Sequence, residues 1–343
     1  MARIWTKTLS LLVLGLAATG PARAQDPETF YRGKNLTLIV GSSVGGGYDA
    51  YSRLLARHFS RHVPGEPNVV VQNMPGASGV RAVNYLYNIA AHDGATFGIG
   101  QRATLVEPVF GGDQVKIDPR KLSWIGGLNT EWSVGIANPA SGLTSLAVAR
   151  QREFPVSSSG AASDGSIYAS ILNNVLGTRF KIVTGYPGTA EEQLAMERGE
   201  VAGRVGWAWG SIQSTARDKL ESGALKPFVL LSPTPQTGID APLARDFAAS
   251  DEDREVLDFA FAPQLFGRPF FGPPGVPADR LAALQKAFAE TAADPAFLDE
   301  AERLRLDISY VPPQDLQALA ERLYATPPHI VERARRARQA NGF

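Results

Sequence analysis

The segment LTLIVGSSVGGGYD, residues 36–49, places an apolar strand directly before three consecutive glycines. An amphipathic helix follows, and its apolar face carries Tyr51, Leu54, Leu55 and Phe59. Glycines at such a junction let the backbone turn sharply and approach a ligand closely. The free N–H groups at the start of the helix, together with the helix dipole, favour an anion there. The segment therefore predicts an anion-binding turn at the end of the first strand.

Three further glycine- or serine-rich turns follow predicted strands, at residues 76–79, 159–165 and 185–189. Short β runs alternate with helical stretches along the chain, a pattern typical of α/β folds with mostly parallel sheets. In such folds ligands bind outside the carboxyl ends of the strands. We therefore expect the four turns, the first at residues 43–47, to converge on one cleft.

The chain is long enough for two α/β lobes. We expect the second lobe to interrupt the first, so that residues 25–128 and 266–343 form lobe 1 and residues 129–265 form lobe 2. The lobes would then hinge near residues 128–133 and 264–268. Residues around 234–250 are rich in proline and predict irregular structure. Amphipathic patterns predict closing helices at residues 278–292, 295–304 and 313–338.

Residues 1–24 have the three parts of a secretory signal peptide. Arg3 and Lys7 make the start positive, residues 9–18 form a short apolar run, and an A-x-A site ends at Ala24. The run of ~10 apolar residues is too short for a membrane-spanning helix, which needs ~20. We expect cleavage after Ala24 and export from the cytoplasm.

The composition excludes several function classes. Basic and acidic residues number 34 each, and removing the signal deletes three basic residues and no acidic one. A near-neutral, slightly acidic chain gives no electrostatic case for binding nucleic acid or an anionic membrane. The absence of cysteine excludes disulfides, thiolate catalysis and cysteine zinc sites. No spacing of histidine and acidic residues suggests a metal, and we expect no cofactor.

Charged side chains near the turns have different expected roles. Asp49 begins a helix, where a carboxylate most simply caps the turn and pairs with Arg53 four residues on. Arg102 follows the strand at 96–100, and its planar guanidinium suits a carboxylate in the cleft. For Arg81 and Arg204 a solvated helix or strand face is the simpler interpretation.

Aromatic side chains near the turns leave two interpretations open. Tyr48 and Tyr186 each lie inside a glycine turn, where a large ring has little core to fill, so either could contact a ligand. Trp207 lies toward the end of a predicted strand in the second lobe. It could pack in the core or line the cleft.

Residues 41–45 also satisfy G-x-S-x-G, which offers an exported serine hydrolase with Ser43 as nucleophile as the alternative function. In a hydrolase this serine turn would follow the first strand, so no earlier strand would be available to supply the loop that forms the oxyanion hole. His58 and His62 are expected on the solvated side of a helix, which leaves His329 as the late candidate base. The pattern therefore favours binding over hydrolysis. It is also a poor phosphate loop, because no Lys-Ser/Thr follows the glycines.

Seven segments in order resemble one family of receptors. They read FYRGK at 30–34, GGGYD at 45–49, VVQNMPGASG at 70–79, AHDGAT at 91–96, TGYPGTA at 184–190, RGEV at 198–201 and PPGVP at 273–277. Together they make the chain similar to the periplasmic solute-binding proteins of tripartite tricarboxylate transporters, the Bug-type or TctC-like receptors. Two segments differ from the common pattern. Ser42-Ser43-Val44 stands where many members have Pro-Pro, and residues 161–166 lack a frequent histidine.

This resemblance implies a non-enzymatic, two-lobed type II periplasmic-binding-protein fold of the venus-flytrap kind. The lobes would close over a small organic carboxylate held by backbone amides, Ser/Thr hydroxyls and water. The partners would be the ligand and membrane permease subunits, and the receptor would be a monomer. From the resemblance and the residues above, the candidate ligand contacts are Ser42, Ser43, Gly45, Gly46, Gly47, Tyr48, Asp49, Ala77, Ser78, Gly79, Gln101, Arg102, Ser159, Gly160, Asp164, Gly165, Ser166, Tyr186, Gly188, Thr189 and Trp207.

Overall fold

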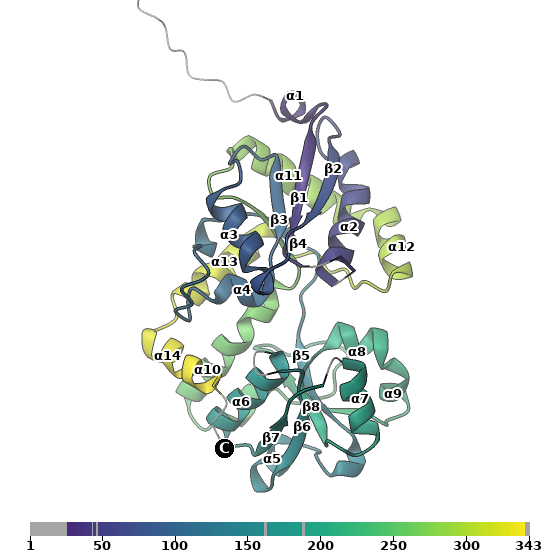
Figure 1. Cartoon of the computed structure of the whole chain (residues 1–343), viewed down its shortest axis with the longest axis vertical. Coiled ribbons are helices and arrows are strands. Elements are labelled where there is room, and N and C mark those ends of the chain that lie inside the picture. The colour runs from purple at the N-terminus through teal and green to yellow at the C-terminus, as the bar shows by residue number, and fades with distance from the viewer. Residues whose placement is uncertain (1–25, 43, 46, 161–162, 187–188, 340–343) are drawn as a thin grey trace, which may run out of the picture.

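The computed structural model describes residues 26–339 apart from 43, 46, 161–162 and 187–188. Two α/β lobes, each built around one five-stranded sheet, lie end to end (Figure 1). The first sheet has the order β2-β1-β3-β10-β4. Its strands are β1 (Asn35–Val40), β2 (Asn68–Asn73), β3 (Thr96–Ile99), β4 (Ser123–Gly127) and β10 (Pro269–Gly272). The two-lobed α/β fold expected from the sequence is confirmed.

The second sheet repeats this plan with the order β7-β6-β8-β5-β9. Its strands are β5 (Ser133–Ala137), β6 (Phe154–Ser157), β7 (Phe180–Val183), β8 (Gly203–Ala208) and β9 (Lys226–Leu231). β1 in the first sheet and β6 in the second are each parallel to both of their neighbours. The strand contributed by a crossing segment, β10 or β5, is antiparallel to both of its neighbours. The carboxyl ends of β1, β2 and β3 therefore meet at one edge of their sheet, and those of β6, β7 and β8 at one edge of theirs.

Helices cover both faces of each sheet (Figure 1). The α-helices are α1 (Pro27–Tyr31), α2 (Gly47–Phe59), α3 (Val80–Asn88), α4 (Arg102–Val106), α5 (Leu146–Gln151), α6 (Asp164–Leu176), α7 (Thr189–Glu197), α8 (Trp209–Thr215), α9 (Arg217–Glu221), α10 (Asp251–Phe261), α11 (Ala278–Ala293), α12 (Pro295–Arg303), α13 (Pro313–Tyr324) and α14 (Pro328–Ala337). Short 3-10 helices are η1 (Ser60–His62), η2 (Ala77–Gly79), η3 (Pro119–Lys121), η4 (Pro139–Ser141), η5 (Ala244–Phe247) and η6 (Ala262–Phe266). No helix among the described residues combines the length and apolar character needed to cross a membrane.

The opening segment folds as its pattern predicts. Leu36, Leu38 and Val40 of β1 are buried against the apolar face of α2. On that face, Phe59 lies 5.6 Å from the ring of Phe97 and 6.3 Å from that of Phe288. Burying a side chain of this size stabilises a fold by about 1.5–3 kcal/mol. This core fixes the end of β1, and with it the first glycine turn, in place.

Two segments connect the sheets, and they run side by side. The first leads from β4 to β5 and the second from η6 to β10. The backbone N–H of Leu128 donates to the carbonyl of Arg268 at 3.2 Å, and that of Glu131 donates to the carbonyl of Gln264 at 3.4 Å. The segments expected at residues 128–133 and 264–268 therefore form a hydrogen-bonded pair of connections between the lobes.

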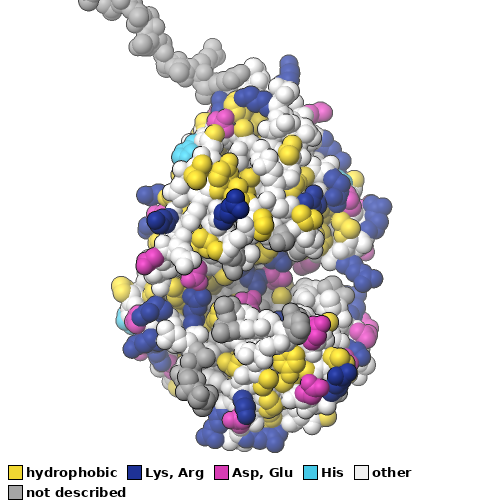
Figure 2. Space-filling view, in the orientation of Figure 1, with side chains coloured by type: hydrophobic (Ala, Val, Ile, Leu, Met, Phe, Trp, Pro, Cys, Tyr) yellow, Lys and Arg dark blue, Asp and Glu magenta, His cyan; other side chains and the backbone are white. Residues whose placement is uncertain are grey.

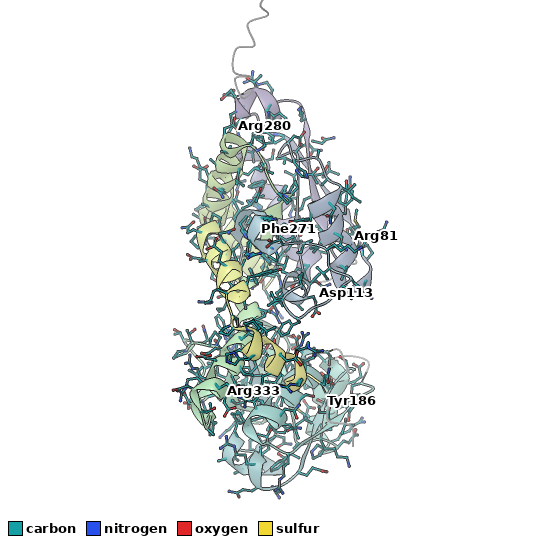
Figure 3. The ribbon with its side chains drawn as sticks, turned by 90° about the vertical axis from the view of Figure 1, so that its left-hand side faces the viewer. Arg81, Asp113, Tyr186, Phe271, Arg280 and Arg333 are labelled. Carbon is teal, nitrogen blue, oxygen red and sulfur yellow. The ribbon has the colours of Figure 1, made fainter. Side chains whose placement is uncertain are left out.

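The C-terminal region differs from its prediction in two respects: the last helix is interrupted, and its final part, expected in lobe 1, packs on α10 and α6 of the second lobe. The helix expected over residues 313–338 is interrupted, because Pro327 and Pro328 lack backbone N–H groups and disfavour helix at the residue before them. After the break, α14 packs on α10 and α6, and Ala337 enters the core of the second lobe. Arg333 of α14 pairs there with Asp253 (Figure 3).

Helix α10 was itself not predicted, although the sequence holds a signal for its start. Ser250 caps the helix by accepting a hydrogen bond from the N–H of Asp253 at 3.0 Å. The proline-rich segment before it does form irregular structure, broken only by the short η5.

Candidate functional site

The first-lobe turns meet at the carboxyl end of the sheet, as expected. Gly79 ends the second turn with φ +87°, a conformation that favours glycine. A Cβ atom added there would lie 3.2 Å from the carbonyl oxygen of Gly41 and 3.3 Å from Cγ of Gln101. The turn after β1, the turn after β2 and Gln101, two residues after β3, therefore pack against one another. Gly45, Gly47 and Ala77 are exposed at this edge, whereas Ser43 and Gly46 lie outside the described residues.

Asp49 holds the first turn from inside. Its carboxylate accepts hydrogen bonds from the N–H of Gly45 at 2.8 Å, Nε of Arg53 at 2.9 Å and Nδ2 of Asn73 at 2.8 Å. Asn73 also donates to the carbonyl of Ser42 at 3.0 Å. Burial raises the pKa of Asp49, but these hydrogen bonds outweigh it and leave the pKa below its usual value. The expected capping role and pairing with Arg53 are confirmed.

Replacing Asp49 by asparagine is expected to loosen the turn. Asparagine in D49N has the same side-chain shape as aspartate, but the variant loses hydrogen bonds to a charged group, which contribute about 1.5–3 kcal/mol each. Because the pKa of Asp49 is lowered on folding, its charge stabilises the protein above the ordinary carboxyl pKa, and this contribution disappears as pH falls through the folded value. Urea unfolding at a series of pH values from 7 downwards should show that the difference in unfolding free energy between D49N and wild type becomes smaller. A gap that does not change with pH would contradict this account.

One of the two second-lobe turns is organised by serine hydroxyls. Oγ of Ser158 lies 2.6 Å from Oγ of Ser163 and 2.7 Å from Oγ of Ser166, and the buried Gly165 packs on Ser158. Ser159 at the tip is exposed, and Gly160 next to it is half-buried. These hydroxyls connect Ser158, just after β6, with Ser163 and Ser166 at the start of α6.

The other second-lobe turn is supported by Arg204. Nη1 of Arg204 donates to Oγ1 of Thr189 at 3.0 Å and pairs with Glu192, which is buried. The expectation that Arg204 has a solvated face is wrong, because α7 covers it. Burial raises the pKa of Glu192 more than Arg204 lowers it. Tyr186 is half-buried at this turn, and Gly188 lies outside the described residues.

Trp207 is 1% exposed and packs in the core of the second lobe. Its indole N–H donates to Oγ of Ser211 at 3.3 Å, and the guanidinium of Arg204 lies 5.4 Å from its ring centroid. In this structure its surroundings match the core-packing interpretation, and a ligand contact stays a prediction.

Four charged side chains gather where the two lobes meet. Arg102 begins α4 after β3, Asp164 begins α6, and Glu131 and Arg268 come from the two connections. Arg102 pairs with Glu131 and, through Nη2, with Oδ2 of Asp164 at 3.2 Å. Nη1 of Arg268 lies 2.9 Å from Oε2 of Glu131. This interlobe charge cluster joins the first lobe, the connections and the second lobe, and Figure 2 shows basic and acidic side chains in the hollow between the lobes.

Two tyrosines of α2 border the interlobe charge cluster. The guanidinium of Arg268 lies 4.5 Å from the ring centroid of Tyr48 and 5.3 Å from that of Tyr51. The backbone N–H of Arg102 donates to the hydroxyl of Tyr48 at 3.3 Å. Burial raises the pKa of Tyr51 to about 12, so its hydroxyl stays neutral and donates to the carbonyl of Asp307 at 2.9 Å. Tyr48 therefore contacts two arginines at the start of α2.

Two members of the cluster, Glu131 and Arg268, were missed in the sequence. Both lie in connecting segments that have no motif, and they meet only because the two connections are hydrogen-bonded side by side. Burial raises the pKa of Glu131, and Arg102 and Arg268 lower it further than burial raises it. The carboxylate is therefore charged and shared between two guanidinium groups.

The histidines nearest the first turn are already paired elsewhere. The expectation that His58 lies on a solvated helix face is wrong, because α12 covers that face and buries the ring against Phe297. Nε2 of His58 lies 2.5 Å from Glu300, and Nε2 of His62 lies 2.9 Å from Asp294. These contacts hold both rings against α11 and α12, away from the carboxyl ends of the strands.

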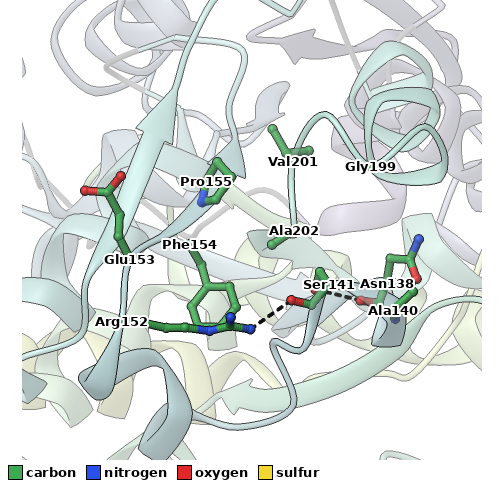
Figure 4. A pocket seen from close by; sticks show the side chains of 10 residues that line it. All are labelled: Asn138, Ala140, Ser141, Arg152, Glu153, Phe154, Pro155, Gly199, Val201 and Ala202. Carbon is green, nitrogen blue, oxygen red and sulfur yellow. Dashed lines mark hydrogen bonds between the residues drawn. The ribbon is translucent and has the colours of Figure 1, made fainter.

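A pocket of about 370 Å³ lies in the second lobe, lined by residues that include Asn138, Arg152 and Gly199 (Figure 4). It borders Phe154 and Pro155 at the amino end of β6. The turns and Asp164 lie at the opposite, carboxyl end of that sheet. The pocket is therefore separate from the interlobe charge cluster.

Solved structures share this arrangement of lobes and sheets. A TctC solute-binding protein from Polaromonas, solved without ligand, superposes with a TM-score of 0.68 at 20% identity and covers 88% of this chain and 99% of its own. The fold is that of a solute-binding protein. MatC from Rhodopseudomonas palustris, with bound malate, gives 0.58 at 21% identity over 87% of this chain and 99% of its own. Rpa4515 from R. palustris, with adipate, gives 0.58 at 19% identity over 88% and 97%.

No protein-family model matches the sequence. No curated protein sequence matches it either. At identities near 20% the structural likeness establishes the fold, so the ligand has to be argued from the residues of this chain.

Proposed function

We propose that this protein is an extracytoplasmic receptor that captures a small organic carboxylate between its lobes. The observation that carries the proposal is Arg102, a guanidinium 12% exposed that projects from the first lobe and contacts a carboxylate of the second. Around it lie the exposed N–H-rich turns of the first lobe and the serine turn of the second. A planar guanidinium and backbone N–H groups together form a site that suits a carboxylate. The malate and adipate held by two structural neighbours are of this class.

The proposed mechanism is lobe closure over the ligand. Paired connections between two rigid sheets allow a hinge motion, and a ligand that contacts both lobes favours the closed state. Charge-assisted hydrogen bonds contribute about 1.5–3 kcal/mol each, so a few of them reach the roughly 8 kcal/mol of micromolar binding. No step of this mechanism is a chemical reaction, and the protein acts as a binder and not as an enzyme.

We further propose a periplasmic location, after cleavage at Ala24, and partnership of a monomeric receptor with permease subunits of a tripartite tricarboxylate-type transporter. The seven sequence segments that resemble such receptors support this, as do the structural neighbours with the same fold. The permease would bind the closed, ligand-bound state of the receptor.

A thermal-shift screen of mono-, di- and tricarboxylates and aromatic acids tests the proposal. At a hundred times its Kd, a ligand of the native state adds about 2.7 kcal/mol of stability. For a chain of this size we expect Tm to rise by roughly 5 °C with at least one acid. If no acid raises Tm, the carboxylate function is excluded.

The variant S43A separates binding from hydrolysis. A receptor with this substitution keeps its thermal shift or loses part of it, whereas a hydrolase that uses Ser43 loses all ester turnover. We expect no ester turnover in wild type or variant. Turnover in wild type that disappears in S43A would support the hydrolase instead.

A further inference from the structure

The two carboxylates on Arg102 differ in how firmly they are held. The Glu131 side chain is 10% exposed and is also bound by Arg268 at 2.9 Å. The Asp164 side chain is 43% exposed and contacts Arg102 through one pair of atoms, at 3.2 Å. Water competes with Arg102 for this half-exposed carboxylate, whereas the Glu131 carboxylate is largely shielded from water. Glu131 is therefore the fixed partner, and Asp164 is the partner that can be replaced.

We propose that Asp164 acts as an internal stand-in for the ligand: it occupies the carboxylate position on Arg102 in the ligand-free protein, and the carboxylate of the ligand displaces it. This inference rests on the function proposed above and assigns the two residues their roles. Arg102 binds the acid group of the ligand, and the ligand must bind Arg102 more strongly than Asp164 does. The exchange keeps the charge balance of the interlobe charge cluster, because one carboxylate leaves Arg102 as another arrives.

In this displacement the Asp164 side chain moves and its backbone stays in place. Its backbone is fixed by close packing on β8, where Gly206 has φ +78° and a Cβ added to it would lie 2.9 Å from the carbonyl oxygen of Asp164. The side chain itself faces water and can rotate into it. Asp164 is also the first residue of the thirteen-residue α6, where the helix dipole stabilises a negative charge without Arg102. The displaced carboxylate therefore keeps a favourable environment.

Arg102 cannot move away in the same manner. It is 12% exposed, its other nitrogen stays on Glu131, and its backbone N–H is bound by Tyr48. A buried guanidinium needs a compensating carboxylate. The site therefore presents a preorganised cation whose outward-facing partner is exchangeable.

The test compares malate and adipate binding to wild type and to the variant D164N by isothermal titration calorimetry. Removing the competing charge is expected to tighten binding of the better of the two acids about three- to tenfold. The variant D251N is the matched control, because Asp251 is also the first residue of a helix and pairs with an arginine, Arg254, outside the cluster. Its affinity should equal that of wild type. The variant R102K, which keeps the charge but loses the fork, should bind at least tenfold more weakly.

Each outcome decides something different. If wild type binds an acid and D164N binds it equally or more weakly, displacement is overturned while the carboxylate function stands. If neither protein binds either acid, and the wider screen of acids also fails, both are overturned. Tighter binding by D164N together with an unchanged D251N supports the exchange.

Discussion

Replacing Glu131 by glutamine is expected to lower the free energy of unfolding by about 3–5 kcal/mol, the range seen when one partner of a buried ion pair is removed. Glu131 neutralises two guanidinium groups at once, those of Arg102 and Arg268. In E131Q, Arg102 keeps Asp164, but Arg268 keeps no carboxylate partner among the described residues. Two mostly buried positive charges would then face each other across a neutral amide.

Acidification should reduce this difference. The pKa of Glu131 is lowered in the folded protein, so its charge stabilises the fold above the ordinary glutamate pKa. That contribution is lost as pH falls through the lower folded pKa, and E131Q should then approach wild type. Urea unfolding at pH 7 and at a series of acidic pH values measures both effects.

The control is E153Q. Glu153 lies 3.9 Å from Lys181 with both side chains well exposed, so its loss should change stability by no more than about 0.5 kcal/mol. If E131Q were destabilised as little as this control, the cluster would not hold the lobes and connections together. The comparison isolates burial, because both variants remove one glutamate from an ion pair.

Local patterns in the sequence were sufficient to predict the first lobe's turns. The apolar residues of β1 and those at helical spacing in α2 indicate which side chains are buried, and this can be inferred from these few residues alone. The role of Asp49 followed from its place at the helix start. The break at Pro327 was also visible in the sequence, since consecutive prolines rarely continue a helix.

The interlobe charge cluster could not be predicted in the same way. Arg268 and Glu131 are 137 residues apart in the chain, and neither lies in a motif. Arg102 and Asp164 were each expected near a ligand, yet no local pattern indicates that they bind each other. Such pairs depend on how the two lobes are arranged, and the hydrophobic periodicity of a sequence carries no information about that arrangement. His58 illustrates the same limit, because only the packing of α12 on α2 buries it.

Replacing Gly267 by alanine is expected to destabilise the connections strongly. Gly267 has φ +53° and ψ −108°, which side chains adopt only at a strain of about 1–3 kcal/mol. A Cβ atom there would lie 1.8 Å from the carbonyl oxygen of Asn129. Relieving that overlap costs about 1–3 kcal/mol more, by analogy with overpacked cores.

The overlap has a structural consequence because of where the neighbour is. Asn129 lies in the other connection, and its carbonyl accepts the N–H of Arg268 at 3.4 Å. A methyl group would push the two connections apart and break this hydrogen bond, and the position of Arg268 over Glu131 depends on it. The variant G177A is the matched control, since Gly177 has φ +68° but nothing within 4 Å of an added Cβ. It should show only the strain, about 1–2 kcal/mol. Urea unfolding should therefore give G267A a much lower free energy of unfolding than G177A. Equal losses of stability in the two variants would show that the connections can separate without an energetic cost.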